Sequence, residues 1–273
     1  MHHESRFQDD GYRSRLVPGL RSSADAQQLA QEIAFATGRL SALRLQPPEI
    51  YAEARALGDI EQASWVCFLA TYLSPLQEQD PFRGIRAVLA QPAGDWHAGL
   101  LPDLEQIPLG PRSSHDPARG LSTLQAYRRW AQNSGSQAHV LAGDPGWSAQ
   151  RRFERAFERL AIAGFSRAGR YELLVTLGAL GLYELCAEAL HPVSSSSHSP
   201  DLMTVAAKRI FGIGDTINIE RRAQTLAQQI DVPLASLDLA LANWGCGERA
   251  TLGFASQIGD QDALRRAQST LGL

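Results

Sequence analysis

Apolar residues recur at intervals of three or four along most of this chain of 273 residues, which is the pattern of helices that bury one face. Alternation of apolar and polar residues, which is typical of strands, hardly occurs, and Gly or Pro closes many of the apolar runs. We therefore predict an all-α fold. The expected helices span residues 24–37, 48–57, 60–73, 81–90, 121–132, 148–161, 167–179, 182–190, 200–210, 217–230, 233–243 and 261–271.

Stretches rich in turn-forming residues interrupt these helices. Residues 91–120 contain many Pro and Gly, so we expect a long loop there between two helical halves. The Ser-rich stretch 191–200 is expected to be exposed and mobile. Residues 1–22 are expected to form a flexible arm, and residues 23–273 a single helical domain with two lobes.

Composition narrows the class of protein. The hydrophobic fraction of 44% and the charged fraction of 20% fit an ordinary folded protein. No run reaches the roughly 18 apolar residues of a spanning helix, and the polar, acidic start is unlike a secretory signal, so we expect a cytoplasmic protein without a membrane partner. The 3 cysteines are widely spaced, which predicts buried thiols rather than a disulfide framework or a metal site.

Charge is distributed unevenly. The net charge of −3 argues against a protein that coats nucleic acid unspecifically. Residues 151–170, however, hold six arginines and two glutamates, a local excess of +4. The helix predicted over 148–161 places Arg151, Arg155 and Arg159 on one face and apolar residues on another. This segment is therefore the candidate surface for a nucleic acid.

The stretch "LAIAGFSRAGRYELL", residues 160–174, predicts a tight reversal between two helices. Gly164 can adopt a positive φ, and the backbone N–H groups of 165–168 open the second helix at the positive end of its dipole. A helix N-terminus beside the guanidinium groups of Arg167 and Arg170 suits a phosphate. An ordinary turn between two helices that ends at Gly164 would have the same pattern.

This hairpin resembles the helix-hairpin-helix of the DNA glycosylase superfamily, with Gly164 at the first hairpin glycine and Ser166 in place of the second. "YLSPLQEQDPFRGI" is similar to the end of an early superfamily helix with a Leu-Ser-Gln-Gln type motif, near which Gln77 lies. "SPDLMTVAAKRIFG" resembles the segment in which a Val-Asp pair opens a basic helix. The resemblance places Asp201 on the family's catalytic aspartate.

A narrower resemblance is to the α-glutamyl/putrescinyl thymine pyrophosphorylase clade of that superfamily, carried by "YLSPLQEQDPFRGI", "GFSRAGRYELLVTLGALGLYEL", "AKRIFGIGD" and "LDLALANWG". It implies an enzyme that acts on a flipped, hypermodified thymine in DNA and displaces pyrophosphate from the 5-methyl carbon with an amine. The implied partners are DNA and a small amine or amino-acid co-substrate, and no metal or redox cofactor is expected. The residues expected to bind DNA are Arg151, Arg155, Gly164, Arg167, Arg170, Gln77 and Lys208.

Two aspartates are the candidate catalytic residues. Asp201 follows Pro200 at a predicted helix start, where backbone N–H groups can hold a carboxylate ionised. It could stabilise positive charge on a sugar, deprotonate an incoming nucleophile, or only cap the helix. Asp238 lies on an apolar helix, where a carboxylate needs either a partner such as an arginine or a chemical use.

Three further residues are candidates for a base pocket. Trp244 could stack on an extruded base, with Asn243 and Tyr72 beside it, although tryptophan and tyrosine at helical spacing also fit a core. The chain's single lysine, Lys208, lies two helical turns after Asp201 and could reach the same face. Because Ala168 stands where lyases of this superfamily carry a hairpin lysine, we expect no strand cleavage.

Alternative functions fit the same residues. A monofunctional DNA glycosylase in base excision repair also needs an extruded base and a carboxylate, and a non-catalytic helix-hairpin-helix protein would need only the DNA contacts. A helical protein without a nucleic-acid partner would show no salt-dependent affinity for DNA. The stretch "IFGIGDTINIERRA" lacks the full glycine motif of a phosphate loop, so we expect a turn with Asp215 as helix cap.

Overall fold

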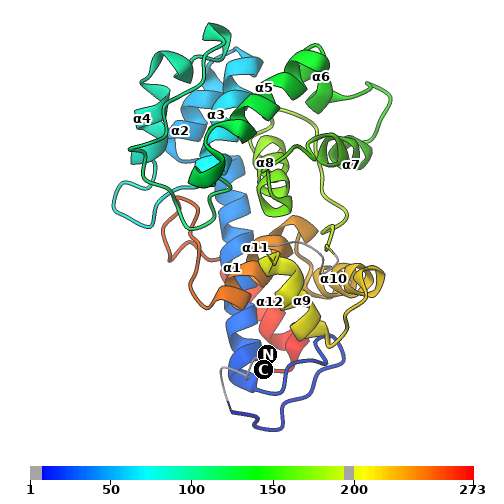
Figure 1. Ribbon diagram of the computed structural model, residues 1–273. Coiled ribbons are helices and arrows are strands. Elements are labelled where there is room, and N and C mark those ends of the chain that lie inside the picture. Colours follow the sequence, from blue (N-terminus) through cyan, green and yellow to red (C-terminus); the bar gives the residue numbers. More distant parts are fainter. Residues whose placement is uncertain (1–7, 194–199) are drawn as a thin grey trace. The chain divides into compact units, whose positions relative to one another are not determined.

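The computed structural model describes residues 8–193 and 200–273 (Figure 1). Within these residues it is all helical, without a strand, which confirms the predicted fold class. The α-helices are α1 (Ser23–Leu45), α2 (Glu49–Ala56), α3 (Ile60–Leu73), α4 (Arg83–Leu89), α5 (Ser122–Asn133), α6 (Gln137–Ala142), α7 (Ala149–Arg159), α8 (Arg167–Ala179), α9 (Leu202–Phe211), α10 (Thr216–Ile230), α11 (Leu234–Cys246) and α12 (Gln261–Leu271). Short 3₁₀ turns occupy Pro92–Gly94, Trp96–Ala98 and Pro117–Arg119.

The chain divides into two compact units. Unit 1 comprises Met1–Leu40, Glu188–Arg249 and Ser256–Leu273, and unit 2 comprises Ser41–Ala187 and Ala250–Ala255. The first boundary falls within α1. The stretch 91–120, expected to connect two helical halves, lies entirely inside unit 2. None of the described helices is both long and apolar enough to cross a lipid bilayer.

Unit 1 is built from both ends of the chain. In it, α9 packs along α11, and α10 contacts α9, α11 and α12. The α1 side chains of Leu29 and Ile33 are fully buried, and α1 is fixed to α11 by a hydrogen bond from Trp244 Nε1 to the Asp25 carbonyl (2.9 Å). The core of unit 1 therefore joins residues that are more than 200 positions apart in sequence, as the separation of 219 in this pair shows.

Residues 8–22 pack against unit 1, which differs from the predicted flexible arm. Val17 and Leu20 are buried, and the Gly19 N–H donates to the Ile210 carbonyl at 2.9 Å. A Cβ at Gly19 would lie 1.8 Å from the carbonyl oxygen of Arg209, so only glycine allows this approach. Residues 1–7 of the predicted arm lie outside the described residues, as do residues 194–199 of the stretch 191–200 that was predicted to be exposed and mobile.

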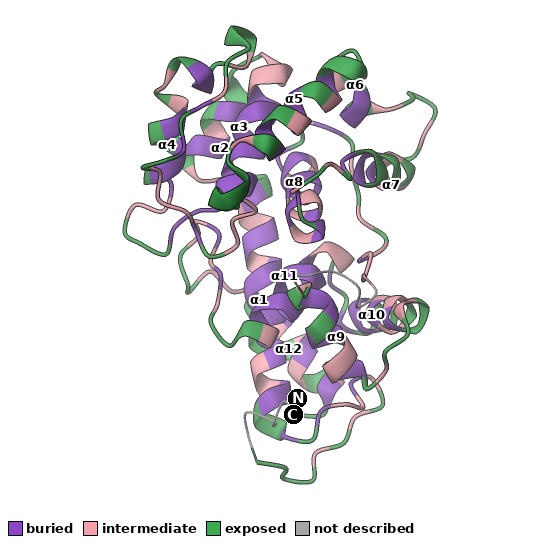
Figure 2. Cartoon of the chain, in the orientation of Figure 1, coloured by how far each residue is buried: buried purple, intermediate pink, exposed green. Residues whose placement is uncertain are grey.

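Unit 2 is organised around α3, which contacts α2, α4, α6 and α8 and is almost entirely buried (Figure 2). Its aromatic side chains form a cluster with Tyr127 of α5. The rings of Phe68 and Tyr127 stack with a centroid separation of 3.6 Å, and Trp65 and Tyr72 stack on either side of Phe68 at 5.5 and 5.6 Å. Burial of such rings supplies much of the hydrophobic stabilisation of a domain this size.

Two helix predictions are wrong for identifiable reasons. Helix α1 does not stop at Gly38; this glycine instead lets residues 258–260 approach, since a Cβ would lie 2.7 Å from the Ile258 carbonyl oxygen. Residues 182–190 form no helix, because Gly181 (φ +72°) ends the preceding helix and Tyr183 is buried with its hydroxyl bonded to Ser64 Oγ. The short helix α6 was missed.

The cysteine prediction holds in part. Cys67 is buried, whereas Cys186 and Cys246 are exposed, and none of these three described residues forms a disulfide. Burial raises the pKa of the Cys67 thiol to about 12.

Candidate functional site

The hairpin predicted at 160–174 is formed by α7, a turn over residues 160–166, and α8. Both helices begin at a serine N-cap: Ser148 Oγ accepts the Arg151 N–H at 3.2 Å, and Ser166 Oγ accepts the Gly169 N–H at 3.0 Å. Serine at this position satisfies one of the N–H groups that a helix start leaves without a partner. The start of α8 at Arg167 agrees with the predicted span.

Gly164 is required in the turn for two reasons. Its φ of +80° lies in the left-handed region, and a Cβ would lie 2.0 Å from Thr123 Oγ1 on α5. The next residue, Phe165, is 5% exposed and packs edge-on against Phe68, with centroids 5.2 Å apart. The sequence Gly-Phe-Ser thus combines a close approach to α5, an anchor in the aromatic cluster and a helix cap.

The turn leaves several backbone donors available. Within the described part of the chain, the N–H groups of Ala163, Gly164 and Ser166 donate to no acceptor. Ala163 and Ser166 are exposed and Gly164 is partly exposed. These amides lie at the positive end of the α8 dipole, so the turn is a surface suited to an anion.

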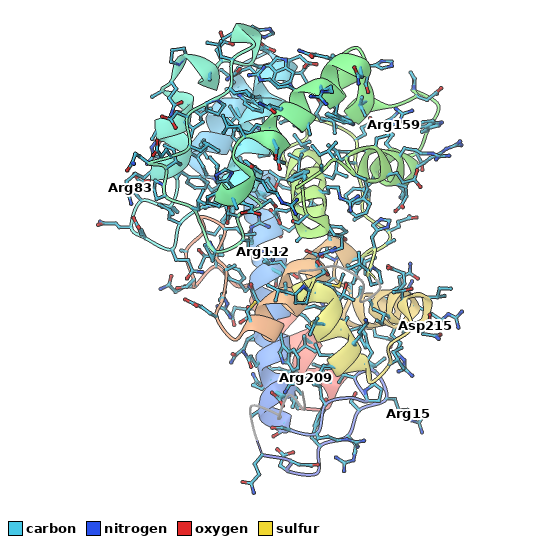
Figure 3. The ribbon with its side chains drawn as sticks, viewed as in Figure 1. Arg15, Arg83, Arg112, Arg159, Arg209 and Asp215 are labelled. Atoms are coloured by element: carbon cyan, nitrogen blue, oxygen red, sulfur yellow. The ribbon has the colours of Figure 1, made fainter. Side chains whose placement is uncertain are left out.

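Three arginines spaced four residues apart extend along α7 beside this turn. Arg151, Arg155 and Arg159 are all exposed, and Arg159, labelled in Figure 3, ends the helix. The Arg151 guanidinium lies 5.0 Å from the centroid of the Trp147 ring, and Arg155 forms an ion pair with Glu158 (2.9 Å). Because both members of that pair are half exposed, water and an anionic ligand can compete for the arginine. We name these three residues the α7 arginine stripe.

The two arginines of α8 differ in exposure: Arg167 is buried and Arg170 is partly exposed. Arg167 is only 6% exposed, and its guanidinium lies 5.4 Å from the centroid of the Tyr171 ring. Arg170 donates from Nη1 to the Phe157 carbonyl (3.1 Å) and covers the Phe157 ring at 4.4 Å. Burial, and then the charge of Arg167, lowers the pKa of Arg170. Arg170 therefore links α8 to α7, whereas Arg167 packs on Tyr171 of its own helix, and the burial of Arg167 contrasts with its predicted role in DNA binding.

A small cavity with several polar side chains in its lining lies against the first turn of α8. The centre of a water-sized sphere can occupy ≈ 10 Å³ of it, which is enough for about one water molecule and too little for a base. The hydroxyls of Thr71 and Ser74 line it, are buried, and find no hydrogen-bond partner among the described residues. Arg112, labelled in Figure 3, and Glu172 also line it.

Ser74 is the strained residue of this cavity. Its φ of 60° and ψ of 138° are rarely adopted by residues with a Cβ, and such outliers concentrate at functional sites. Ser74 belongs to the segment that resembles the Leu-Ser-Gln-Gln type motif, and Gln77 follows in an exposed loop. The sequence shows that α3 must end before Pro75, but it does not show the positive φ or the unpartnered hydroxyls.

Asp201 is the N-cap of α9 in unit 1. Its Oδ2 accepts the Thr204 N–H at 2.9 Å and the Thr204 hydroxyl at 2.7 Å, and Thr204 Oγ1 accepts the Val193 N–H at 3.1 Å. The carboxylate is partly exposed. The predicted position at a helix start is therefore observed. Lys208 lies in the last turn of the same helix and is partly exposed.

Asp238 and the residues proposed for a base pocket are buried. Asp238, Asn243 and Trp244 are each 2% exposed on α11, and Tyr72 in unit 2 is 0% exposed. Asn243 Nδ2 donates to Glu32 Oε2 at 3.3 Å. These side chains are core residues of their own units, so in this structure no face of Trp244 or Tyr72 is open to a base.

The Tyr72 hydroxyl is used inside unit 2, where it lies 2.8 Å from His115 Nδ1. Burial raises the pKa of Tyr72 and lowers the pKa of His115, so both groups are neutral near pH 7. Among the described residues, no group of three or more His, Cys, Asp or Glu side chains could hold a metal ion.

Comparison with known proteins found no similarity: no family model matches the chain, and neither the curated proteins nor the solved structures contain a match.

Proposed function

We propose that unit 2 binds the DNA backbone through the turn of the hairpin and the α7 arginine stripe, and that the protein is a DNA base-modifying enzyme acting on an extruded thymine-type base. The observation that carries the proposal is the group of turn amides without an acceptor at the start of α8, next to exposed arginines. Phosphate oxygens accept from such amides without steric conflict, because Gly164 has no side chain.

The α7 arginine stripe adds positive charge along one face of α7. Its three residues span eight positions, or roughly 12 Å of helix at about 1.5 Å per residue. Contacts of this kind position a protein on DNA without reading its sequence. In this proposal Arg170 links the two helices of the hairpin, because it bonds to the backbone of α7, and the buried Arg167 makes no phosphate contact.

The chemistry is taken from the resemblance to the thymine pyrophosphorylase clade. The amine nitrogen would bond to the 5-methyl carbon as the carbon–oxygen bond to pyrophosphate breaks, and the amine would lose a proton. Asp201 is the proposed acceptor of that proton, because its carboxylate is partly exposed and held by two donors on Thr204.

DNA binding is tested first, by measuring the affinity for a duplex over a range of salt concentrations. Each of Arg155→Ala and Arg159→Ala should lower the slope of log K against log salt by about 1. Arg83→Ala on α4 is the matched control, because Arg83 is exposed and paired with Glu78 (3.0 Å) as Arg155 is with Glu158. Absence of salt-dependent binding, or equal effects of all three variants, would overturn the proposal.

Turnover is tested with a duplex that carries a 5-(pyrophosphoryloxymethyl)uracil and a small amine such as putrescine. Asp201→Asn should reduce product formation by roughly 10²–10⁴-fold and leave DNA affinity unchanged. Asp215→Asn is the control, since Asp215 caps α10 in the same unit through Asn218 as Asp201 caps α9 through Thr204. Release of a free base that leaves an alkali-labile site in the DNA would indicate a glycosylase instead. DNA binding without any product would indicate a non-catalytic protein.

A further inference from the structure

A second concave surface, in unit 1, carries three arginines. The depression measures ≈ 260 Å³ and is lined by Arg15, Leu16, Asn218, Arg221, Arg222 and Thr225. From these residues we propose a phosphate-binding site on α10, which we name the α10 arginine pocket. The proposal does not depend on the function proposed above, because it rests on different residues in the other unit.

The pocket has contributions from two segments of the chain. Four of the lining residues share a face of α10, because they are spaced three, one and three positions apart along the helix: Asn218, Arg221, Arg222 and Thr225. Arg15 comes from the segment 8–22, and Arg222 Nη1 donates to its carbonyl at 3.3 Å. That contact joins the two segments. Arg15 is labelled in Figure 3.

None of the residues that line the pocket is a carboxylate. Among the described residues, Arg15, Arg221 and Arg222 form no ion pair. Three guanidinium groups that share one depression repel one another, and a bound anion would relieve this repulsion.

The neighbouring acidic residues are engaged elsewhere. Asp9 pairs with Arg13 (3.6 Å), and Asp10 accepts from the Ser23 N–H (3.0 Å). At the start of α10, Asp215 accepts from Asn218. The side chain of Glu220 accepts the backbone N–H groups of 190 and 191. None of these acids lines the pocket.

The donor set fits a phosphate group. Guanidinium groups present planar pairs of N–H donors that match phosphate oxygens, and they stay charged at all physiological pH values. Asn218 adds an amide group, one N–H of which donates to Asp215, whereas the Thr225 hydroxyl donates to the Arg221 carbonyl. The depression leaves room for a phosphate group with part of its hydration.

The surface beside the pocket leaves space for the organic part of a phosphate ester. A shallower depression of ≈ 430 Å³ shares Arg221 and continues past Thr216 and the 69% exposed Ile217 to His191. A phosphate ester bound at Arg221 could place its organic part there. The ester could be a small metabolite or the backbone of a nucleic acid, and the chemistry at the arginines would be the same.

The test measures the melting temperature of the full chain in sodium phosphate and in sodium chloride of equal ionic strength. Specific binding raises the melting temperature of the wild type only in phosphate. Arg221→Ala should weaken phosphate affinity roughly tenfold, the lower end of what a charge-assisted hydrogen bond contributes. Arg265→Ala is the control, because Arg265 is an exposed arginine of α12 in the same unit.

A second arm separates the two sources of phosphate. If the site binds nucleic-acid backbone, Arg221→Ala should lower the affinity for a short DNA duplex and its salt slope by about 1, whereas Arg265→Ala should not. If the site binds a small ester, Arg221→Ala should reduce only the stabilisation by phosphate and should leave the affinity for DNA unchanged. The proposal is overturned if phosphate gives no more stabilisation than chloride and Arg221→Ala leaves DNA affinity unchanged. Arg221→Ala should not disturb folding, because the Arg221 side chain makes no hydrogen bond within the described residues.

Discussion

Replacement of Gly164 by alanine tests the geometry of the hairpin turn most directly. The left-handed backbone should cost alanine roughly 1–2 kcal/mol. The new Cβ would also lie 2.0 Å from Thr123 Oγ1, so α5 or the turn must move, and overpacking of this kind costs about 1–3 kcal/mol. We therefore expect Gly164→Ala to lower the free energy of unfolding of unit 2 by about 2–5 kcal/mol.

Gly135→Ala separates the two contributions. Gly135 has a φ of +88°, and a Cβ added there would meet no atom within 4 Å, so its substitution carries the backbone cost alone, roughly 1–2 kcal/mol. Urea unfolding followed by tryptophan fluorescence reports on unit 2, which holds Trp65, Trp96, Trp130 and Trp147. Equal losses for Gly164→Ala and Gly135→Ala would refute the close approach to α5.

The double variant Gly164→Ala/Thr123→Ala locates the conflict. Because Thr123→Ala removes the oxygen that meets the new Cβ, part of the loss caused by Gly164→Ala should be recovered. The expected coupling energy is about 1–3 kcal/mol in favour of the double variant. Strict additivity of the two single substitutions would show that the strain lies in the backbone only.

Three further predictions concern other parts of the chain. A hydrogen bond between His97 Nε2 and Asp59 (2.7 Å) raises the pKa of His97 above 6.5 and lowers that of Asp59 below 3.8. The His97 contribution to stability is thus complete below pH 6.5 and is lost as the pH rises through the raised pKa. The Asp59 contribution is lost as the pH falls below 3.8. In an NMR titration, Asp59→Asn should return the pKa of His97 to about 6.5. Ser74→Gly should raise the unfolding free energy by about 1 kcal/mol, because it removes a strained φ and an unpartnered hydroxyl, and a loss measured by urea unfolding would contradict this. A thiol reagent should modify the native chain at Cys186 and Cys246 and spare Cys67 until unfolding, as peptide mapping can show.

The sequence predicted helices well where local signals alone decide their ends. The spans 60–73 and 167–179 agree with α3 and α8, because α3 has an aspartate cap and ends before a proline, and α8 begins at a serine cap. The prediction of helix ends failed where a contact with a distant segment of the chain determines the local structure. Gly38 looks like a helix stop but permits the approach of residues 258–260, and no local pattern distinguishes the two roles.

The candidate site was predicted in part. Periodicity placed the α7 arginine stripe on an exposed face, and Pro200 followed by an aspartate indicated the cap at Asp201. The inward position of Arg167 could not be predicted, because an arginine at a helix start can face a phosphate or an aromatic ring equally well, and here it lies over Tyr171. The α10 arginine pocket was missed because Arg15 is some 200 residues from its neighbours, as the separation of 207 to Arg222 shows.

The construction of unit 1 from both chain ends has a consequence for synthesis on the ribosome. Helix α1 is made early, yet Glu32 must wait for Arg249, 217 residues later, before their ion pair (2.7 Å) can form. At about 5–20 residues per second, that delay is on the order of 10–40 s. During this time the fully buried Leu29 and Ile33 have none of their final neighbours from α11 or α12. Unit 2 can form meanwhile, so the first helix to leave the ribosome should be among the last to be packed.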